Sequence, residues 1–271
     1  MKDLHPVEEL ARDERFVRVP LQDRFSDPRT VPEGDDMGGG RMHPMDAVAP
    51  EAARSLMHGI FMGEIQALEG AGRTAWDFRA DGETPYPLLL DMARQCWDEA
   101  RHVEISVKLM EHMGTRIGEF SESTFLYEAA CNPDPVLRLC GVNRALEGLA
   151  IDVFNTMRDF GTEGNDPVMA LAEDWMLADE VTHVKMGSDW LRRLTDKDPD
   201  RRANALLFQR TVDKLFSLGG LRGESEENPI QLARTFRRLS GFTEEEIDEV
   251  AGASAEATEE ARGGLVAPVA S

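Results

Sequence analysis

Cysteine is scarce in this sequence of 271 residues, and the sequence contains no long apolar run. The three cysteines, Cys96, Cys131 and Cys140, have no CxxC spacing, and such an odd, sparse set predicts reduced thiols in a cytoplasmic protein. No apolar run approaches the ~20 residues that span a bilayer, and the charged segment 1–10 lacks the apolar stretch of a signal peptide. We therefore expect a cytoplasmic chain with no membrane partner.

Basic residues are also in the minority. The 30 lysines and arginines face 51 aspartates and glutamates, which gives a net charge of −21. This balance argues against nucleic acid or an anionic membrane as a partner. The segment 192–238 is rich in arginine, so a local basic face is compatible with the sequence.

Helical patterns dominate the sequence after Pro50, and no convincing strand alternation accompanies them. Several positions pair an N-cap residue with a following proline, Thr243 and Glu246 form a capping-box pattern, and two glycines mark helix ends. The N-cap positions are Thr84, Asp134, Asp166, Asp198 and Asn228, and the glycines are Gly114 and Gly161. These signals predict long helices at 51–79, 85–113, 135–160 and 167–195, and shorter helices at 200–218, 229–239 and 244–252.

The sequence therefore predicts an all-α fold in four parts. Residues 1–49, rich in proline and glycine, form an irregular N-terminal arm, and residues 50–195 form a four-helix bundle. Residues 196–254 add a C-terminal helical extension. Residues 255–271, rich in alanine, glutamate and glycine, are expected to be a disordered tail.

Two of the long helices carry nearly the same phrase. One reads Asp98-Glu99 and then His102, and the other reads Asp179-Glu180 and then His183. Residues three apart lie on one face of a helix, so each glutamate and its histidine can reach one metal ion. A single such phrase is compatible with a charged surface helix, but two of them favour a metal site.

The other two long helices each place a glutamate among apolar residues, Glu64 in the first and Glu147 in the third. Glu64 precedes Glu99 by 35 positions and Glu147 precedes Glu180 by 33, so the chain holds two similar helix pairs. Glu69 competes with Glu64 as the ligand, and the internal match to Glu147 favours Glu64. Glu69 then matches Asp152, and we expect both to support the centre or line a channel.

Together these residues are the ligand set of a carboxylate-bridged dinuclear site in a four-helix bundle. The predicted ligands are Glu64, Glu99, His102, Glu147, Glu180 and His183. Four carboxylates balance two divalent ions, and oxygen and imidazole ligands suit iron or manganese. A metal-bound histidine needs an acceptor for its other ring N–H, so we expect Asp98 to pair with His183 and Asp179 with His102.

This pattern resembles the ferritin-like superfamily of di-iron carboxylate proteins, and within it a bacterial ferritin-like family of unknown function related to the tRNA hydroxylases. The segments that carry the resemblance are 63–69, 98–102, 146–152, 179–184 and 228–246. It implies a cofactor of two iron ions, with manganese/iron as an alternative, and O₂ as co-substrate.

Apolar residues near Glu64 and Glu147 are candidates for a substrate pocket, although ordinary bundle core explains each of them equally well. They are Ile60, Phe61, Ala67, Ala150, Ile151 and Phe154. The expected function is an oxidase or monooxygenase that acts on a small organic substrate, with an external electron donor and a homodimer left open. The alternatives are a ferroxidase or iron-handling protein, a tRNA-modifying hydroxylase and a redox-inert, metal-stabilised interaction module.

Overall fold

The computed structural model describes residues 49–217, 221–226 and 228–266, with side chains described as far as residue 259. In these residues the fold is all-α, as predicted, apart from one pair of two-residue strands. The expected irregular arm lies outside the described residues except for Ala49, which is buried and donates its N–H to the carbonyl oxygen of Met113 at 3.2 Å.

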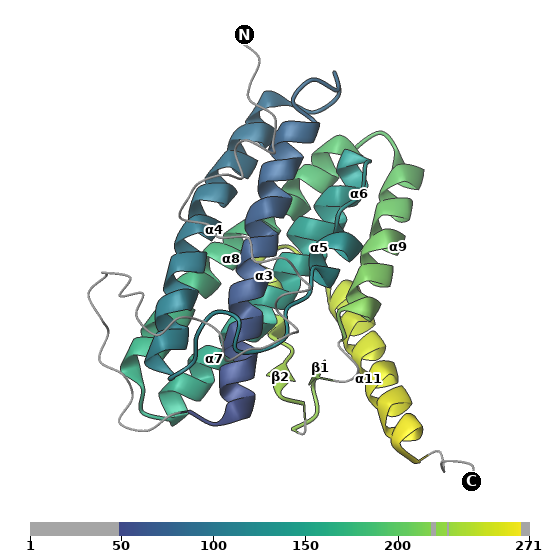
Figure 1. The fold of residues 1–271 in the computed structure, drawn as a ribbon. Coiled ribbons are helices and arrows are strands. Elements are labelled where there is room, and N and C mark those ends of the chain that lie inside the picture. Colours follow the sequence, from purple (N-terminus) through teal and green to yellow (C-terminus); the bar gives the residue numbers. More distant parts are fainter. Residues whose placement is uncertain (1–48, 218–220, 227, 267–271) are drawn as a thin grey trace.

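Four long helices form the bundle: α3 (Glu51–Asp77), α4 (Tyr86–His112), α7 (Glu147–Glu163) and α8 (Pro167–Leu194). Figure 1 shows α3 and α4 side by side along most of their length. Nε2 of His112, the last residue of α4, lies 2.7 Å from Oδ2 of Asp166, the N-cap of α8. Since α7 also ends just before Asp166, α4 and α7 run in the same direction, and a long crossover joins them.

The third predicted helix is not one regular helix. It consists of α6 (Pro135–Leu139), a π-helical segment η1 (Cys140–Leu146) and α7, while a further short helix, α5 (Phe125–Ala130), lies in the crossover. The N–H of Glu147 donates to the carbonyl oxygen of Val142, five residues back instead of four. A single α-helix over 135–160 was therefore the wrong prediction, and the wider turn falls directly before a predicted metal ligand, as π-segments often do.

The C-terminal extension contains α9 (Pro199–Leu215), α10 (Arg234–Leu239) and α11 (Glu244–Val266). Between α9 and α10, β1 (Arg222–Gly223) pairs in parallel with β2 (Ile230–Gln231). This pairing replaces the predicted helix start at Asn228, because it uses the backbone of residues 230–231. The expected disorder from residue 255 is also wrong as far as Val266, since alanine and glutamate continue α11. Residues 267–271 lie outside the described part.

Most of the predicted helix caps are confirmed. Side chains of Asp134, Asp166 and Asp198 accept hydrogen bonds from the first N–H groups of α6, α8 and α9. Thr243 and Glu246 form the predicted capping box, with contacts of 2.8 and 3.2 Å. Gly114 ends α4 with a φ of 79°.

Two of the predicted helix ends shift. Pro85 is the N-cap of α4, in place of Thr84. Gly161 lies inside α7, which ends at Glu163, and an added Cβ there would lie 2.7 Å from the backbone N of Ala170. Gly161 is therefore explained by the close approach of α8, whose first residues leave no room for a larger side chain.

Buried ion pairs fasten the extension to the bundle. Arg237 of α10 donates from Nη2 to Asp152 of α7 at 2.6 Å and from Nε at 3.0 Å, and neither side chain is exposed. Arg222 Nη1 lies 3.7 Å from the same carboxylate and Arg222 Nη2 lies 3.7 Å from Asp213. Asp152 therefore holds α10 in place, which corrects the expectation that it supports the centre or lines a channel.

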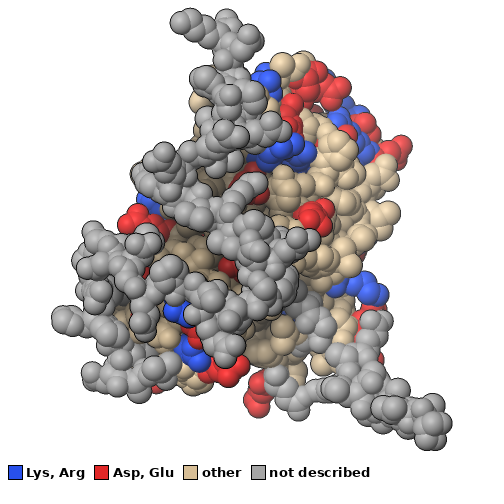
Figure 2. Space-filling model, in the orientation of Figure 1, with Lys and Arg blue, Asp and Glu red and all other residues tan. Residues whose placement is uncertain are grey.

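The arginine-rich segment does not form an unopposed basic face. Arg201, Arg210, Arg234 and Arg238 pair with acidic side chains, and Arg222 and Arg237 are buried. On the face shown in Figure 2, acidic and basic side chains are interspersed. No helix in the described ranges is both long enough and apolar enough to cross a bilayer.

Candidate metal centre

The six predicted metal ligands come from all four bundle helices and meet in the interior. Helical periodicity places Glu99 and His102 on the inner face of α4, and Glu180 and His183 on that of α8. Glu64 faces them from the middle of α3, and Glu147 is the first residue of α7. All six side chains are buried. Glu69, the alternative to Glu64, is exposed and lies outside the site.

One half of the site surrounds His102. Its Nδ1 lies 3.1 Å from Glu64 Oε2, 3.2 Å from Glu99 Oε2 and 3.1 Å from Glu180 Oε1. These four residues offer one ligand atom each within 4.8 Å of one another. The spacing suits a single ion bound by three carboxylates and one imidazole.

The other half surrounds His183. Its Nδ1 lies 3.0 Å from Glu99 Oε1 and 3.4 Å from Glu180 Oε2, and Glu147 completes a second group of four. Glu99 and Glu180 belong to both halves and present a different oxygen to each histidine. Two ions held by these two groups would share two carboxylates, as in a dinuclear centre.

Unpartnered buried atoms show that the site fits cations. Among the described residues, Glu99 Oε2, both carboxylate oxygens of Glu180 and His183 Nδ1 have no hydrogen-bond partner. A buried polar atom without a partner is costly, and two metal ions, one in each half of the site, would satisfy these atoms. The chain therefore contains a buried cluster of glutamates and histidines that is able to hold two metal ions.

The outer nitrogen of each histidine lies beside an aspartate of the opposite helix. Nε2 of His102 is 3.2 Å from Asp179 Oδ2, and Nε2 of His183 is 3.3 Å from Asp98 Oδ2. This is the crossed arrangement expected from the sequence. An N–H at Nε2 leaves Nδ1, the nitrogen that faces the glutamates, as the metal-binding atom.

The electrostatics of the metal-free cluster show its demand for positive charge. Burial raises the pKa of Glu64 to about 8, and burial and the negative charge of Glu99 raise the pKa of Glu147 well above its usual range. Burial opposes a charge on the histidines, but the surrounding carboxylates outweigh it and raise the pKa of both His102 and His183. Protons thus take the place that two divalent ions would fill.

A short chain of amides supports Glu147, and the sequence reading missed it. Gln95 of α4 donates from Nε2 to Glu147 Oε1 and is 3.4 Å from Glu99 Oε1, and Asn143 of η1 donates to Gln95 Oε1 at 2.6 Å. Gln95 lies one turn before Glu99, so helical spacing was the signal that could have identified it. Asn143 has no such signal, because its position depends on the π-helical turn.

Glu173 was missed as well. It is fully buried on α8, and neither of its carboxylate oxygens has a hydrogen-bond partner within the described part of the chain. Burial, together with the negative charge of Glu64, raises the pKa of Glu173 well above its usual range. It stands seven positions, or about two helical turns, before Glu180, so it extends the acidic face of α8 beyond the centre.

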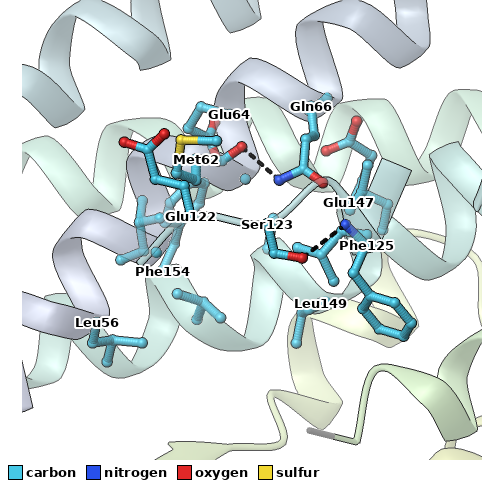
Figure 3. Close-up of a pocket in the computed structure, with 18 of the residues that line it drawn as sticks. Leu56, Met62, Glu64, Gln66, Glu122, Ser123, Phe125, Glu147, Leu149 and Phe154 are labelled. Carbon is cyan, nitrogen blue, oxygen red and sulfur yellow. Dashed lines mark hydrogen bonds between the residues drawn. The ribbon is translucent and has the colours of Figure 1, made fainter. Parts of the chain in front are cut away.

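A cavity of about 280 Å³ adjoins the centre on the side of α3 and α7. Figure 3 shows Glu64 and Glu147 among its lining residues, together with Leu56, Leu149 and Phe154. The segment before α5 supplies Ser121, Glu122 and Ser123. The walls are mostly apolar, and two of the predicted ligands, although buried from bulk solvent, form part of the lining.

The predicted pocket residues divide into two groups. Ile60, Ala67, Ala150 and Phe154 line the cavity. Phe61 and Ile151 do not, and both are buried in the main hydrophobic core. Each follows a lining residue directly, and one helical step of ~100° turns its side chain away from the cavity. Including Phe61 and Ile151 in the pocket was therefore wrong.

This chain is similar in sequence or in fold to several known proteins. An uncharacterised protein of Haemophilus influenzae is 23% identical over 202 residues, which cover 72% of this chain and 69% of that protein. A solved variant of an R2-like ligand-binding oxidase with an aerobically reconstituted Mn/Fe cofactor is 20% identical, with a TM-score of 0.51, over 78% of this chain and 79% of that one. A second variant of such an oxidase is 21% identical over the same shares, with a TM-score of 0.49. The first of these structures shows that the helical fold is shared.

The family is shown by the sequence itself. A family model described as protein of unknown function (DUF455) matches residues 24–248, which include all six predicted ligands and both aspartates. This agrees with the resemblance to a ferritin-like family of unknown function. The chain belongs to the DUF455 family.

Proposed function

We propose that this chain is a dinuclear non-haem metal oxidase that uses O₂ to oxidise a small, largely apolar organic molecule. One observation carries the proposal: Glu64 and Glu147 belong to the two halves of the metal site and also line the cavity. A molecule in the cavity would therefore meet the centre directly, with no side chain between them.

The donor set supports iron in both positions, with manganese/iron as the alternative. Four carboxylates and two imidazoles without a thiolate suit these metals. The R2-like ligand-binding oxidase of similar fold was reconstituted with a Mn/Fe cofactor. When bound, such a metal pair supplies the electrons and the Lewis acidity for the reduction of O₂.

The protein would orient the centre and keep water away from it. Asp98 and Asp179 hold the imidazole rings through Nε2, and Gln95 holds one oxygen of Glu147. The apolar walls would exclude bulk water and select an apolar substrate. At about 280 Å³ the cavity lies at the small end of ligand pockets, which favours a small molecule.

The first test loads the protein anaerobically with Fe²⁺ and then adds O₂. We expect about two irons per chain by metal analysis and an O₂-dependent change in the near-ultraviolet and visible spectrum. Glu64→Ala should weaken iron binding and abolish the change. Glu69→Ala is the matched control, because it alters an exposed glutamate of the same helix.

Other outcomes would separate the alternatives. A chain that binds zinc but no iron, or binds iron without reacting with O₂, would contradict the proposal and favour a metal-stabilised module. Iron uptake by a cage-sized particle on gel filtration would favour iron handling instead. Salt-sensitive retention on tRNA would favour the RNA-modifying reading.

A further inference from the structure

Two exposed tryptophans enclose an arginine on the outer face of α4 and α8. Trp97 is 63% exposed and Trp175 is 44% exposed, whereas Trp190 is 6% exposed. The Cζ atom of Arg101 lies 4.0 Å from the centre of the Trp97 ring and 4.8 Å from that of Trp175. Exposed tryptophan beside arginine is the composition of binding hot spots.

Arg101 also joins this cluster to the metal centre. Its Nη2 pairs with Asp98 and lies 3.3 Å from Asp179 Oδ2. These are the two aspartates that lie beside the outer nitrogens of His183 and His102, at 3.3 and 3.2 Å. One surface arginine is therefore in contact with the supports of both histidines.

Stacking alone does not account for the cluster. Arg79 stacks on Trp76 at 3.7 Å and Arg193 on Trp190 at 4.9 Å, so an arginine over an indole is common in this chain. Within the described ranges, neither Arg79 nor Arg193 pairs with Asp98 or Asp179. Positioning of the two aspartates would explain Arg101, but it does not require two solvent-exposed indole rings around it.

The position of the two exposed tryptophans relative to the cavity gives a reason for their exposure. The cavity opens between α3, α7 and the segment before α5, whereas the tryptophans lie on α4 and α8, the other two helices of the bundle. Substrate and electrons would thus reach the centre from different sides. A bound substrate would not block the approach of a reductant.

We propose that Trp97, Arg101 and Trp175 form the route by which electrons from an external one-electron reductant reach the oxidised centre. This inference rests on the proposed oxidase function. The reductant contacts the indole rings, and each electron crosses to His183 or His102 through contacts that are all 4.8 Å or shorter. For each electron that the donor loses, the oxidation state of one metal ion falls by one. No covalent bond forms or breaks.

The test measures this reduction step separately from turnover. The iron-loaded protein is oxidised with O₂, made anaerobic and mixed with reduced methyl viologen, a one-electron reductant whose flat aromatic cation stacks on indole. Loss of the absorption of the oxidised centre gives the second-order rate constant. The Trp97→Leu/Trp175→Leu double variant should be reduced about tenfold more slowly than the parent, as expected for loss of a cation–π contact.

Trp76→Leu is the matched control, because Trp76 also stacks on an arginine but lies at the end of α3, away from Asp98 and Asp179. It should be reduced at the parental rate. Iron content, the affinity of the metal-free chain for Co²⁺ and the reaction of the ferrous protein with O₂ should be the same in all three proteins.

The two proposals fail in different ways. A parent that holds no iron or ignores O₂ contradicts the oxidase function, and this inference fails with it. A parent that reacts with O₂, together with a double variant reduced at the parental rate, overturns this inference alone. If the double variant loses iron, the single variants Trp97→Leu and Trp175→Leu replace it, and parental rates in both would overturn the inference.

Discussion

Nε2 of His102 lies 3.2 Å from the carboxylate of Asp179, a residue of the neighbouring helix that directly precedes a predicted ligand. The reverse pair, His183 and Asp98, repeats the geometry at 3.3 Å. Each phrase of the duplicated motif thus supplies a glutamate and a histidine to the centre and an aspartate to the histidine of the other phrase. The two helices depend on each other for the orientation of their ligands.

Asp179→Asn should therefore weaken metal binding without removing a ligand. The asparagine can still accept a hydrogen bond, but it lacks the charge that makes the imidazole a stronger ligand. Loss of such a partner typically costs ~10–100-fold in affinity. Competition with a chelator would measure the change, and Asp174→Asn, whose side chain is 65% exposed on the same helix, should leave the affinity unchanged. Equal affinities in the two variants would contradict the orienting role.

The metal-free chain should lose stability as the pH rises from about 5 to about 8. The pKa of Glu64 lies at about 8 in the folded chain, well above the 4.5 of a solvent-exposed glutamate, so the folded state retains a proton that the unfolded state releases. The raised pKa values of His102 and His183 act in the same direction, because their contribution is complete below about 6.5 and is lost at higher pH.

Melting temperatures across this pH range would test that expectation. With chelator present the melting temperature should fall as the pH rises, and with metal bound the fall should be much smaller, because the ligands are then deprotonated. Glu64→Gln should reduce the fall in the metal-free chain. A metal-free chain that becomes more stable towards pH 8 would contradict this account of the cluster.

Arg237→Met should destabilise the fold without touching the centre. The substitution leaves the carboxylate of Asp152 buried beside Arg222 alone, and removal of one partner of a buried pair costs ~3–5 kcal/mol. Urea denaturation of the metal-free chain would measure the loss. Arg238→Met is the control, since Arg238 and Glu244 form an exposed pair that solvent screens, and its loss should change the stability little. Similar losses in both variants would count against a special role for the buried pair.

Gly63 offers a way to close the cavity while leaving the ligands intact. A Cβ added at Gly63 meets no atom within 4 Å, so close helix packing does not explain this glycine. Gly63→Ala should stabilise α3 by ~0.5–1 kcal/mol, because glycine is a poor helix former.

Gly63→Leu should fill part of the cavity and abolish binding of a small apolar probe such as toluene, observed by NMR, with iron binding retained. Toluene binding that survives in Gly63→Leu would place the probe elsewhere.

The six residues of the buried cluster could be predicted from the sequence because the signals for them are local and repeated. Two glutamate–histidine phrases, each on a strongly periodic helix, determine which side chains share a face, and the bundle then brings four such faces together. The cavity lining required more than periodicity. Ile60 and Phe61 are neighbours in the chain, yet only the first faces the cavity, and that distinction depends on how each helix is rotated against its partners.

Other features depend on tertiary context. Asn228 and Pro229 carry a helix-start signal, but the pairing of residues 230–231 with β1 uses that backbone instead. Glu173 has no motif partner, and only its burial in the folded chain marks it as unusual. The π-helical turn left no compositional trace in residues 140–146.

That turn separates α6 and α7 into two rotational registers. The hydrogen bond of Glu147 reaches back five residues instead of four, so the wide turn takes up one more residue than an α-helical turn would. If residues 140–146 formed regular α-helical turns instead, with the same number of residues, Glu147 would be rotated by roughly 100° around the helix axis. That helix would have more regular hydrogen bonds, yet Glu147 would point away from the other five predicted ligands, so the irregular turn preserves the cluster at the expense of helical regularity.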